Sequence, residues 1–286
     1  MFAIYLTDLI TDNSIQDFNS NSGYRNVIAQ IFADLEQIII ENPSTGVTEP
    51  VKIELQSMSV NSGVLASASS YYDYLGVAAG TIVEGEVWKA INSGFNDPDN
   101  WDGLIRVNFF HSWYSDFNNP SGITGTNTFD MYAVLLHEIM HALGFASGID
   151  ELGNPKNGRA FLKYDNLLHT DTNDDLIVST GLDWSFNSAV SINTITNGCP
   201  STSEIRLGDN NLPVHSPQVF SNGSSLSHVD LNNDCNYPLN DFIMAYAIAA
   251  ETSRRPLSQE FDILCSLNYN LSTQFADGDT LNIDAI

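Results

Sequence analysis

Apolar residues in the first 110 positions follow two different periods, which predict a layer of alternating strands and helices. Runs or alternations of apolar residues are typical of strands at residues 2–6, 51–55 and 103–110. Apolar residues at three- and four-residue spacing predict helices over residues 25–41, which Asn42-Pro43 ends, and over residues 81–92. The Gly- and Ser-rich stretch 57–70 is expected to be a loop.

The most distinct helix pattern runs from Phe129 to Leu143. Thr128 is a candidate N-cap, Asp130 stands in the first turn, where its charge suits the helix dipole, and Gly144 is a stop signal. Nearly all other positions in this segment are apolar. A helix of this kind must be buried on most of its sides.

The remaining chain is rich in Asn, Asp, Ser and Gly, with a last helix expected over residues 258–267. We place a lobe boundary near Gly148. The predicted organisation is an amino-terminal lobe (1–147) that ends in the apolar helix, a loop-rich carboxyl-terminal lobe (148–270), and a tail or the start of a further module (271–286). The expected fold class is α+β.

Composition excludes several classes of function. The chain has 286 residues, with 35 acidic and 10 basic side chains and a formal charge of −25. This charge repels phosphate groups, and no basic cluster offsets it, so we expect no nucleic-acid partner. The apolar runs are shorter than the roughly 20 residues of a membrane span, so we expect no membrane insertion.

The polar loops, the low lysine content and the cysteines bear on localisation. Cys199, Cys235 and Cys265 form no C-x-x-C pair, and one disulfide with one thiol left over is expected. The composition is typical of exported proteins, so we expect a secreted, monomeric protein. The N-terminus lacks the features of a signal peptide, so an exported form would be a trimmed one.

Chemistry concentrates in the apolar helix, where His137-Glu138-Ile139-Met140-His141 forms an H-E-x-x-H motif. Residues at i and i+4 lie on one face, so both imidazoles can bind one ion while Glu138 reaches a metal-bound water. The alternative is a core helix with two hydrogen-bonded histidines. That alternative is costly, because three ionisable groups would be buried on one helical turn without an ion to satisfy them.

From His137 to Gly144 the sequence resembles the metzincin metalloproteases, in which a glycine three residues after the second histidine turns the chain towards the metal. Most of that clan carry a third histidine three residues further on. This sequence has Ser147 there. The third ligand must therefore come from another position.

The segments Ser225-Leu-Ser-His228 and Asp241-Phe-Ile-Met244-Ala-Tyr246 resemble leishmanolysin-type enzymes, in which an insertion separates the glycine from the third histidine. The resemblance implies His137, His141 and His228 as ligands and Met244 in a turn under the metal. It also implies a two-lobe fold with a mixed twisted sheet and two main helices in the amino-terminal lobe. Alternative third ligands are His215 and the acidic residues Asp150 and Glu151.

Two further assignments follow from the wider clan. In its astacin-like and serralysin-like branches a tyrosine two residues after the turn methionine reaches the metal, which makes Tyr246 a candidate catalytic residue or, alternatively, a core tyrosine. The strand at 103–110 stands where the clan has the edge strand that pairs with an extended peptide substrate.

The expected function is that of a secreted zinc endopeptidase, with a protein or peptide substrate and with Glu138 as general base. The alternative is a non-catalytic adhesion or interaction module that kept the metal-binding fold, which Ser147 in place of a ligand motivates. Calcium is a second possible cofactor, because Asp171–Asp175 and Asp230–Asp234 place oxygen ligands at alternating positions. A solvated acidic loop is the alternative for each.

Overall fold

The architecture was taken from a computed structural model of the chain. It describes residues 2–6, 17–19, 21–40, 50–93, 100–170, 176–179, 185–186, 205–208, 212–217, 219–230 and 242–272. Its centre is a four-stranded mixed sheet in the order β1-β2-β5-β3. The strands are β1 (Phe2–Leu6), β2 (Val51–Met58), β3 (Ala66–Ser70) and β5 (Gly103–Asn108), of which β1, β2 and β5 are parallel and β3 is antiparallel to β5.

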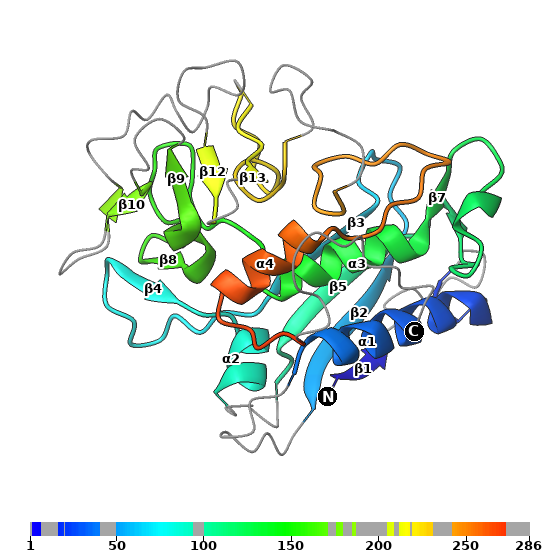
Figure 1. Cartoon of the computed structure of the whole chain (residues 1–286), viewed down its shortest axis with the longest axis horizontal. Helices are drawn as coiled ribbons and strands as arrows, with labels where there is room; N and C mark the ends of the chain where they lie inside the picture. The colour runs from blue at the N-terminus through cyan, green and yellow to red at the C-terminus, as the bar shows by residue number, and fades with distance from the viewer. Residues whose placement is uncertain are drawn as a thin grey trace.

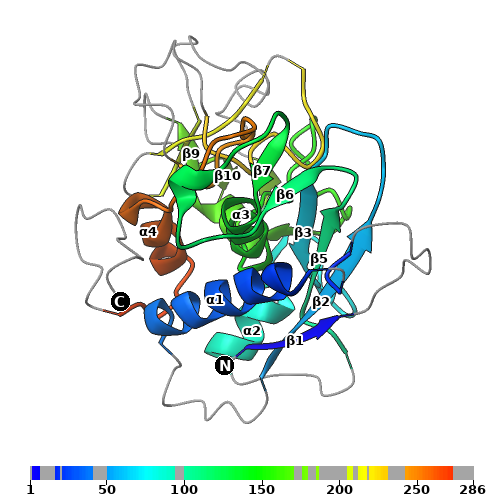
Figure 2. The same ribbon diagram turned by 90° about the vertical axis from the view of Figure 1, so that its right-hand side faces the viewer.

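Three helices lie on one side of this sheet, as Figure 2 shows. They are α1 (Ser22–Ile38), α2 (Glu86–Asn92) and α3 (Met131–Ala142). Helix α3 packs against β3 and β5, and α1 packs beside α3 on the same side of the sheet. Eleven of its twelve residues are buried, which confirms the prediction made from its apolar sequence. The fourth helix, α4 (Ser258–Ser266), lies beside α3 (Figure 1).

Short strand pairs complete the described structure. The parallel pairs are β4 (Thr81–Val83) with β8 (Ala160–Leu162), and β6 (Ser112–Tyr114) with β7 (Thr128–Asp130). The antiparallel groups are β9 (Leu168–Thr170), β12 (Ile205–Leu207) and β13 (Leu212–Pro213), and β10 (Val178–Ser179) with β11 (Ser185–Phe186). Two 3₁₀ turns cover Pro120–Gly122 and Lys163–Leu167. The described part of the chain is therefore α+β, as predicted.

Two expectations for the sheet were wrong, one from the sequence pattern and one from the resemblance. The stretch 57–70 is not only loop, because it contains β3. The strand predicted at 103–110 is β5, which lies between β2 and β3 and so is not an edge strand. The edge next to the apolar helix is β3, whose sequence Ala-Ser-Ala-Ser-Ser lacks the large β-branched residues that normally mark a strand.

Helix boundaries also differ from the predictions. The helix expected over 81–92 is the strand β4 followed by α2, because residues 81–83 pair with β8 far along the chain. At the start of α3, the N-cap is Asp130 and not Thr128; the Asp130 carboxylate accepts hydrogen bonds from the N–H groups of Tyr132 and Ala133. These contacts satisfy backbone donors that the helix leaves unpaired.

Several sequence predictions lie outside the described residues. These include Cys199 and Cys235, both acidic segments considered for calcium apart from Asp230, and most of the tail at 271–286. Cys265 lies on α4 as an exposed free thiol. Within the described ranges, no helix combines the length and the apolar character needed to cross a bilayer.

Candidate metal centre

Helix α3 supplies two imidazoles from one face, and the chain reversal after it fixes one of them. His137 and His141 are one turn apart on the helix, with Nε2 atoms 3.1 Å from each other. Gly144 ends the helix with φ +108°, a conformation that residues with a side chain rarely adopt. This reversal brings the Phe145 carbonyl oxygen to 2.6 Å from His141 Nδ1.

The third imidazole comes from an irregular segment, residues 221–230. The Nδ1 of His228 lies 2.8 Å from the Ser224 carbonyl oxygen, within the same turn. Backbone bonds tie the turn to a neighbouring segment: His215 N–H donates to the His228 carbonyl, and Leu226 N–H donates to the His215 carbonyl. Leu226 is fully buried and adopts φ +65°, an outlier for a bulky residue, so contacts around the turn must stabilise this backbone.

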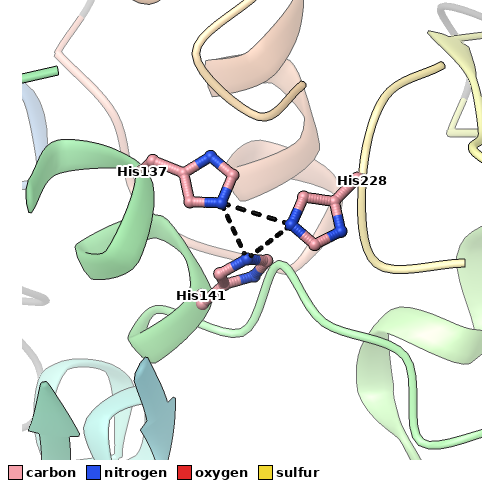
Figure 3. Close-up of side chains that lie close together, drawn as sticks. All are labelled: His137, His141 and His228. Carbon is pink, nitrogen blue, oxygen red and sulfur yellow. Dashed lines mark hydrogen bonds between the residues drawn. The ribbon is translucent and has the colours of Figure 1, made fainter. Parts of the chain in front are cut away.

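The three imidazoles point their Nε2 atoms at one another (Figure 3). The separations of His228 Nε2 from the Nε2 atoms of His137 and His141 are both 3.2 Å. Each Nδ1 faces a backbone carbonyl oxygen, which for His137 is that of Ile243 at 2.7 Å. A carbonyl can only accept, so each Nδ1 carries the proton and each Nε2 presents a lone pair. Three converging lone pairs form a site that can bind a metal ion.

Burial keeps these imidazoles in the neutral form that binds metal. It lowers the pKa of His137 to about 3 and that of His141 to about 4, and it places the pKa of His228 well below its ordinary value. Charge repulsion from His141 adds to the lowering for His137 and His228. Among the described residues, these three histidines form the cluster that lies close enough to bind a metal ion.

Glu138 lies beside the cluster and lines the same pocket. The pocket has a volume of about 540 Å³ and is bordered by residues 63–68, α3, residues 221–224 and residues 243–248. Glu138 is buried, and this burial raises the pKa of its carboxyl to about 8. A carboxyl group whose pKa is close to neutral pH, in contact with a cavity, can take up and release a proton there.

Tyr246 borders the pocket but makes its main contact elsewhere. Its ring stacks on that of His215 with centroids 3.9 Å apart and an interplanar angle of 16°. The tyrosine is 44% exposed, so it is not a core residue. His215, considered as an alternative ligand, lies outside the cluster, with Nδ1 3.7 Å from Asp230 Oδ1.

The other alternative ligands also lie outside the cluster. Asp150 Oδ1 accepts hydrogen bonds from the N–H groups of Leu152 and Asn154 in a local turn, and Glu151 is exposed. Ser147, at the position of the usual third histidine, is buried, and its hydroxyl donates a hydrogen bond to Asp165. Its N–H donates to the hydroxyl of Ser227, which is the neighbour of His228. Ser147 therefore connects the end of α3 to the segment that carries His228.

The predicted turn methionine is a packed core residue. Met244 is fully buried, and its carbonyl oxygen accepts the N–H of Val229, next to His228. The following buried charges were not singled out from the sequence: Asp165, Arg254 and Glu260. Burial raises the pKa of Asp165 to about 6 and that of Glu260 to about 7, although each accepts backbone N–H bonds that act in the opposite direction.

The sequence did not single out these carboxylates because most of the groups that they bind are distant along the chain: Asp165 binds Ser147 and Gly148, and Glu260 binds Ile243 and Met244. A polar residue on a predicted helix, such as Glu260, is ordinarily solvated. No protein family model and no curated protein sequence matches the chain.

Proposed function

We propose that the protein is a zinc-dependent endopeptidase with His137, His141 and His228 as the metal ligands. The observation that carries this proposal is the convergence of three unprotonated Nε2 atoms beside a buried glutamate in an open pocket. Tetrahedral zinc with Zn–N bonds of 2.0–2.1 Å would hold its nitrogen ligands about 3.3 Å apart. The observed separations of 3.1–3.2 Å fit this geometry.

The donor set favours a catalytic site over a structural one. Structural zinc sites use four protein ligands, whereas catalytic sites use three and leave one position for water or substrate. The described residues contribute three imidazoles, and the pocket borders all three. Ser147 in place of the usual ligand motivates the adhesion-module alternative, but His228 offers a third imidazole, which favours the enzyme.

Glu138 is assigned the proton transfers. Zinc in this site would polarise the substrate carbonyl and lower the pKa of a coordinated water to about 7. Glu138 accepts one proton as water adds to the peptide carbonyl carbon, and delivers it to the amine nitrogen as the C–N bond breaks. The products are one carboxylic acid and one amine. Tyr246 is assigned as a donor to the developing oxyanion from the rim of the pocket.

The edge strand β3 is the proposed docking site for the substrate backbone. Within the described structure β3 pairs only with β5, and residues 66–68 line the pocket. Its remaining backbone N–H and C=O groups can therefore pair with an extended peptide. Such pairing binds many sequences, which suits an endopeptidase.

The resemblance to leishmanolysin-type metzincins extends the proposal to the two-lobe arrangement and to a secreted location. The positive φ of Gly144, the position of His228 beside His137 and His141, and the burial of Met244 are consistent with the resemblance at the metal centre. The two-lobe arrangement and the secreted location rest on the resemblance and the composition alone.

The test combines metal analysis with proteolysis. Purified protein should contain one zinc per chain and cleave casein, and a chelator should abolish cleavage. Glu138→Gln should retain zinc but lose about 10²–10⁴-fold in kcat, the usual contribution of a general base. Glu151→Gln, which changes an exposed glutamate outside the pocket, is the matched control and should cleave normally. Cleavage that is indifferent to Glu138→Gln would overturn the proposal.

A further inference from the structure

The turn at residues 242–247 is held by two buried charged side chains from the carboxyl-terminal segment. Glu260, on α4, accepts hydrogen bonds from the N–H of Met244 at 2.6 Å and the N–H of Ile243 at 3.1 Å. Arg254 donates from Nη1 to the carbonyl oxygens of Ala247 at 2.8 Å and Phe242 at 3.4 Å. Glu260 therefore binds backbone N–H groups of this turn, and Arg254 binds its backbone carbonyl groups.

The same turn holds two parts of the metal centre. The Ile243 carbonyl oxygen accepts the Nδ1 proton of His137 at 2.7 Å. The Met244 carbonyl oxygen accepts the N–H of Val229 at 2.8 Å, and Val229 directly follows His228. A continuous path of hydrogen bonds thus runs from the Glu260 carboxylate through the turn to His137 on α3 and to the segment of His228.

We propose that Glu260 is a positioning residue of the metal centre, because its carboxylate fixes the turn whose Ile243 and Met244 carbonyls orient His137 and the His228 segment. This inference rests on the metal-binding part of the proposed function. It does not depend on peptidase activity.

The environment of Glu260 indicates a function beyond packing. The side chain is fully buried, and its second oxygen also accepts the N–H of Leu257 at the start of α4. Burying a carboxyl group in a helix core is unfavourable compared with an apolar residue unless it satisfies other buried polar groups. Here it satisfies three backbone donors, two of them in the turn. Partners that orient ligating histidines typically change metal affinity by 10–100-fold when they are removed.

The experiment compares metal binding in the full-length protein and three variants. Glu260→Ala removes all three acceptor contacts, whereas Glu260→Gln keeps the shape but replaces one oxygen by an NH₂ group that cannot accept. Asp102→Asn is the matched control, because Asp102 is a buried carboxylate that accepts a backbone hydrogen bond at 2.6 Å from Lys52 in the sheet. The readouts are the zinc Kd by chelator competition, the absorption spectrum of the cobalt-substituted protein, and the melting temperature.

We expect zinc binding to weaken by 10–100-fold in Glu260→Ala and by about 10-fold in Glu260→Gln, with altered cobalt bands in both. Asp102→Asn should lower the melting temperature but leave the zinc Kd within twofold of wild type and the cobalt spectrum unchanged. If Glu260→Ala does not fold, Glu260→Gln decides the question. A folded Glu260→Gln protein with wild-type zinc affinity and a wild-type cobalt spectrum would overturn the positioning role.

The outcomes also separate this inference from the proposed function. A wild-type protein that binds zinc but cleaves no peptide would contradict the peptidase proposal, and the affinities would still test Glu260. A wild-type protein that binds no divalent metal would overturn both.

Discussion

The two halves of the candidate metal centre are held in place by different kinds of contact. His137 and His141 project from a regular, buried helix, so their relative position follows from helical geometry. His228 projects from a non-helical turn with a left-handed Leu226, and bonds to residues 147, 215 and 244 fix that turn. The comparison teaches that local sequence determines one half of the site, whereas the other half depends on contacts between distant segments.

The largest expected effect comes from removing a ligand from either half. His137→Ala and His228→Ala should each weaken zinc binding by more than about 100-fold, beyond the range for residues that only orient ligands. His169→Ala is the control, because His169 is a buried histidine outside the cluster that contacts the Gly208 carbonyl. Equilibrium dialysis with elemental analysis measures the effect. Zinc retention by His228→Ala would show that the irregular half is not part of the site.

A second prediction concerns Asp165, which binds Ser147, the residue that connects the end of α3 to the segment of His228. Its carboxylate accepts bonds from the Ser147 hydroxyl and from the N–H groups of Gly148 and Leu162. Burial raises its pKa from the ordinary 3.8 to about 6. The folded state therefore binds this proton more tightly than the unfolded state. The stabilisation of the folded state by protonated Asp165 is fully present below pH 3.8 and is lost as the pH rises through 6.

Asp165→Asn removes this pH dependence because the amide does not ionise. The free energy of unfolding of the variant minus that of wild type should rise by about 3 kcal/mol between pH 3.5 and pH 7, since a shift of about two pKa units corresponds to this energy. Urea unfolding of metal-free protein in matched buffers measures the difference. A difference that stays constant with pH would mean that the pKa of Asp165 is the same in the folded and unfolded states, which would contradict the raised pKa.

A smaller effect is expected at the reversal that follows the helix. Gly144→Ala should destabilise the protein by about 1–2 kcal/mol, because a side chain disfavours a positive φ. Space is not the cause, since the nearest atom to an added Cβ is Leu267 Cδ1 at 3.7 Å. Gly158→Ala is a control with the same sign of φ and no neighbour within 4 Å. Both variants should lose stability, but zinc affinity should fall only in Gly144→Ala, where the Phe145 carbonyl orients His141.

Much of the regular half could be predicted from the sequence. The apolar pattern located α3 to within two residues at its amino end, and the i, i+4 spacing placed His137 and His141 on one face. The resemblance to leishmanolysin-type enzymes, and not a periodicity, identified His228.

The remaining features depend on tertiary contacts that leave no local pattern. Strand β3 consists of Ala and Ser, and it forms a strand because β5 pairs with it. Thr81–Val83 continued an apparent helical pattern, but its pairing with β8 determines its structure. Glu260 stands at an ordinary position of a helix, and only the fold reveals which backbone groups its carboxylate accepts.

The most direct test of the metal centre is X-ray absorption at the zinc edge of the purified, zinc-loaded protein. The proposed function predicts a four-coordinate ion with nitrogen or oxygen neighbours at 2.0–2.1 Å and outer-shell scattering from the three clustered imidazoles. The His228→Ala protein should show outer-shell scattering from no more than two imidazoles. Absence of bound zinc, or an identical spectrum for wild type and His228→Ala, would contradict a site assembled from both halves.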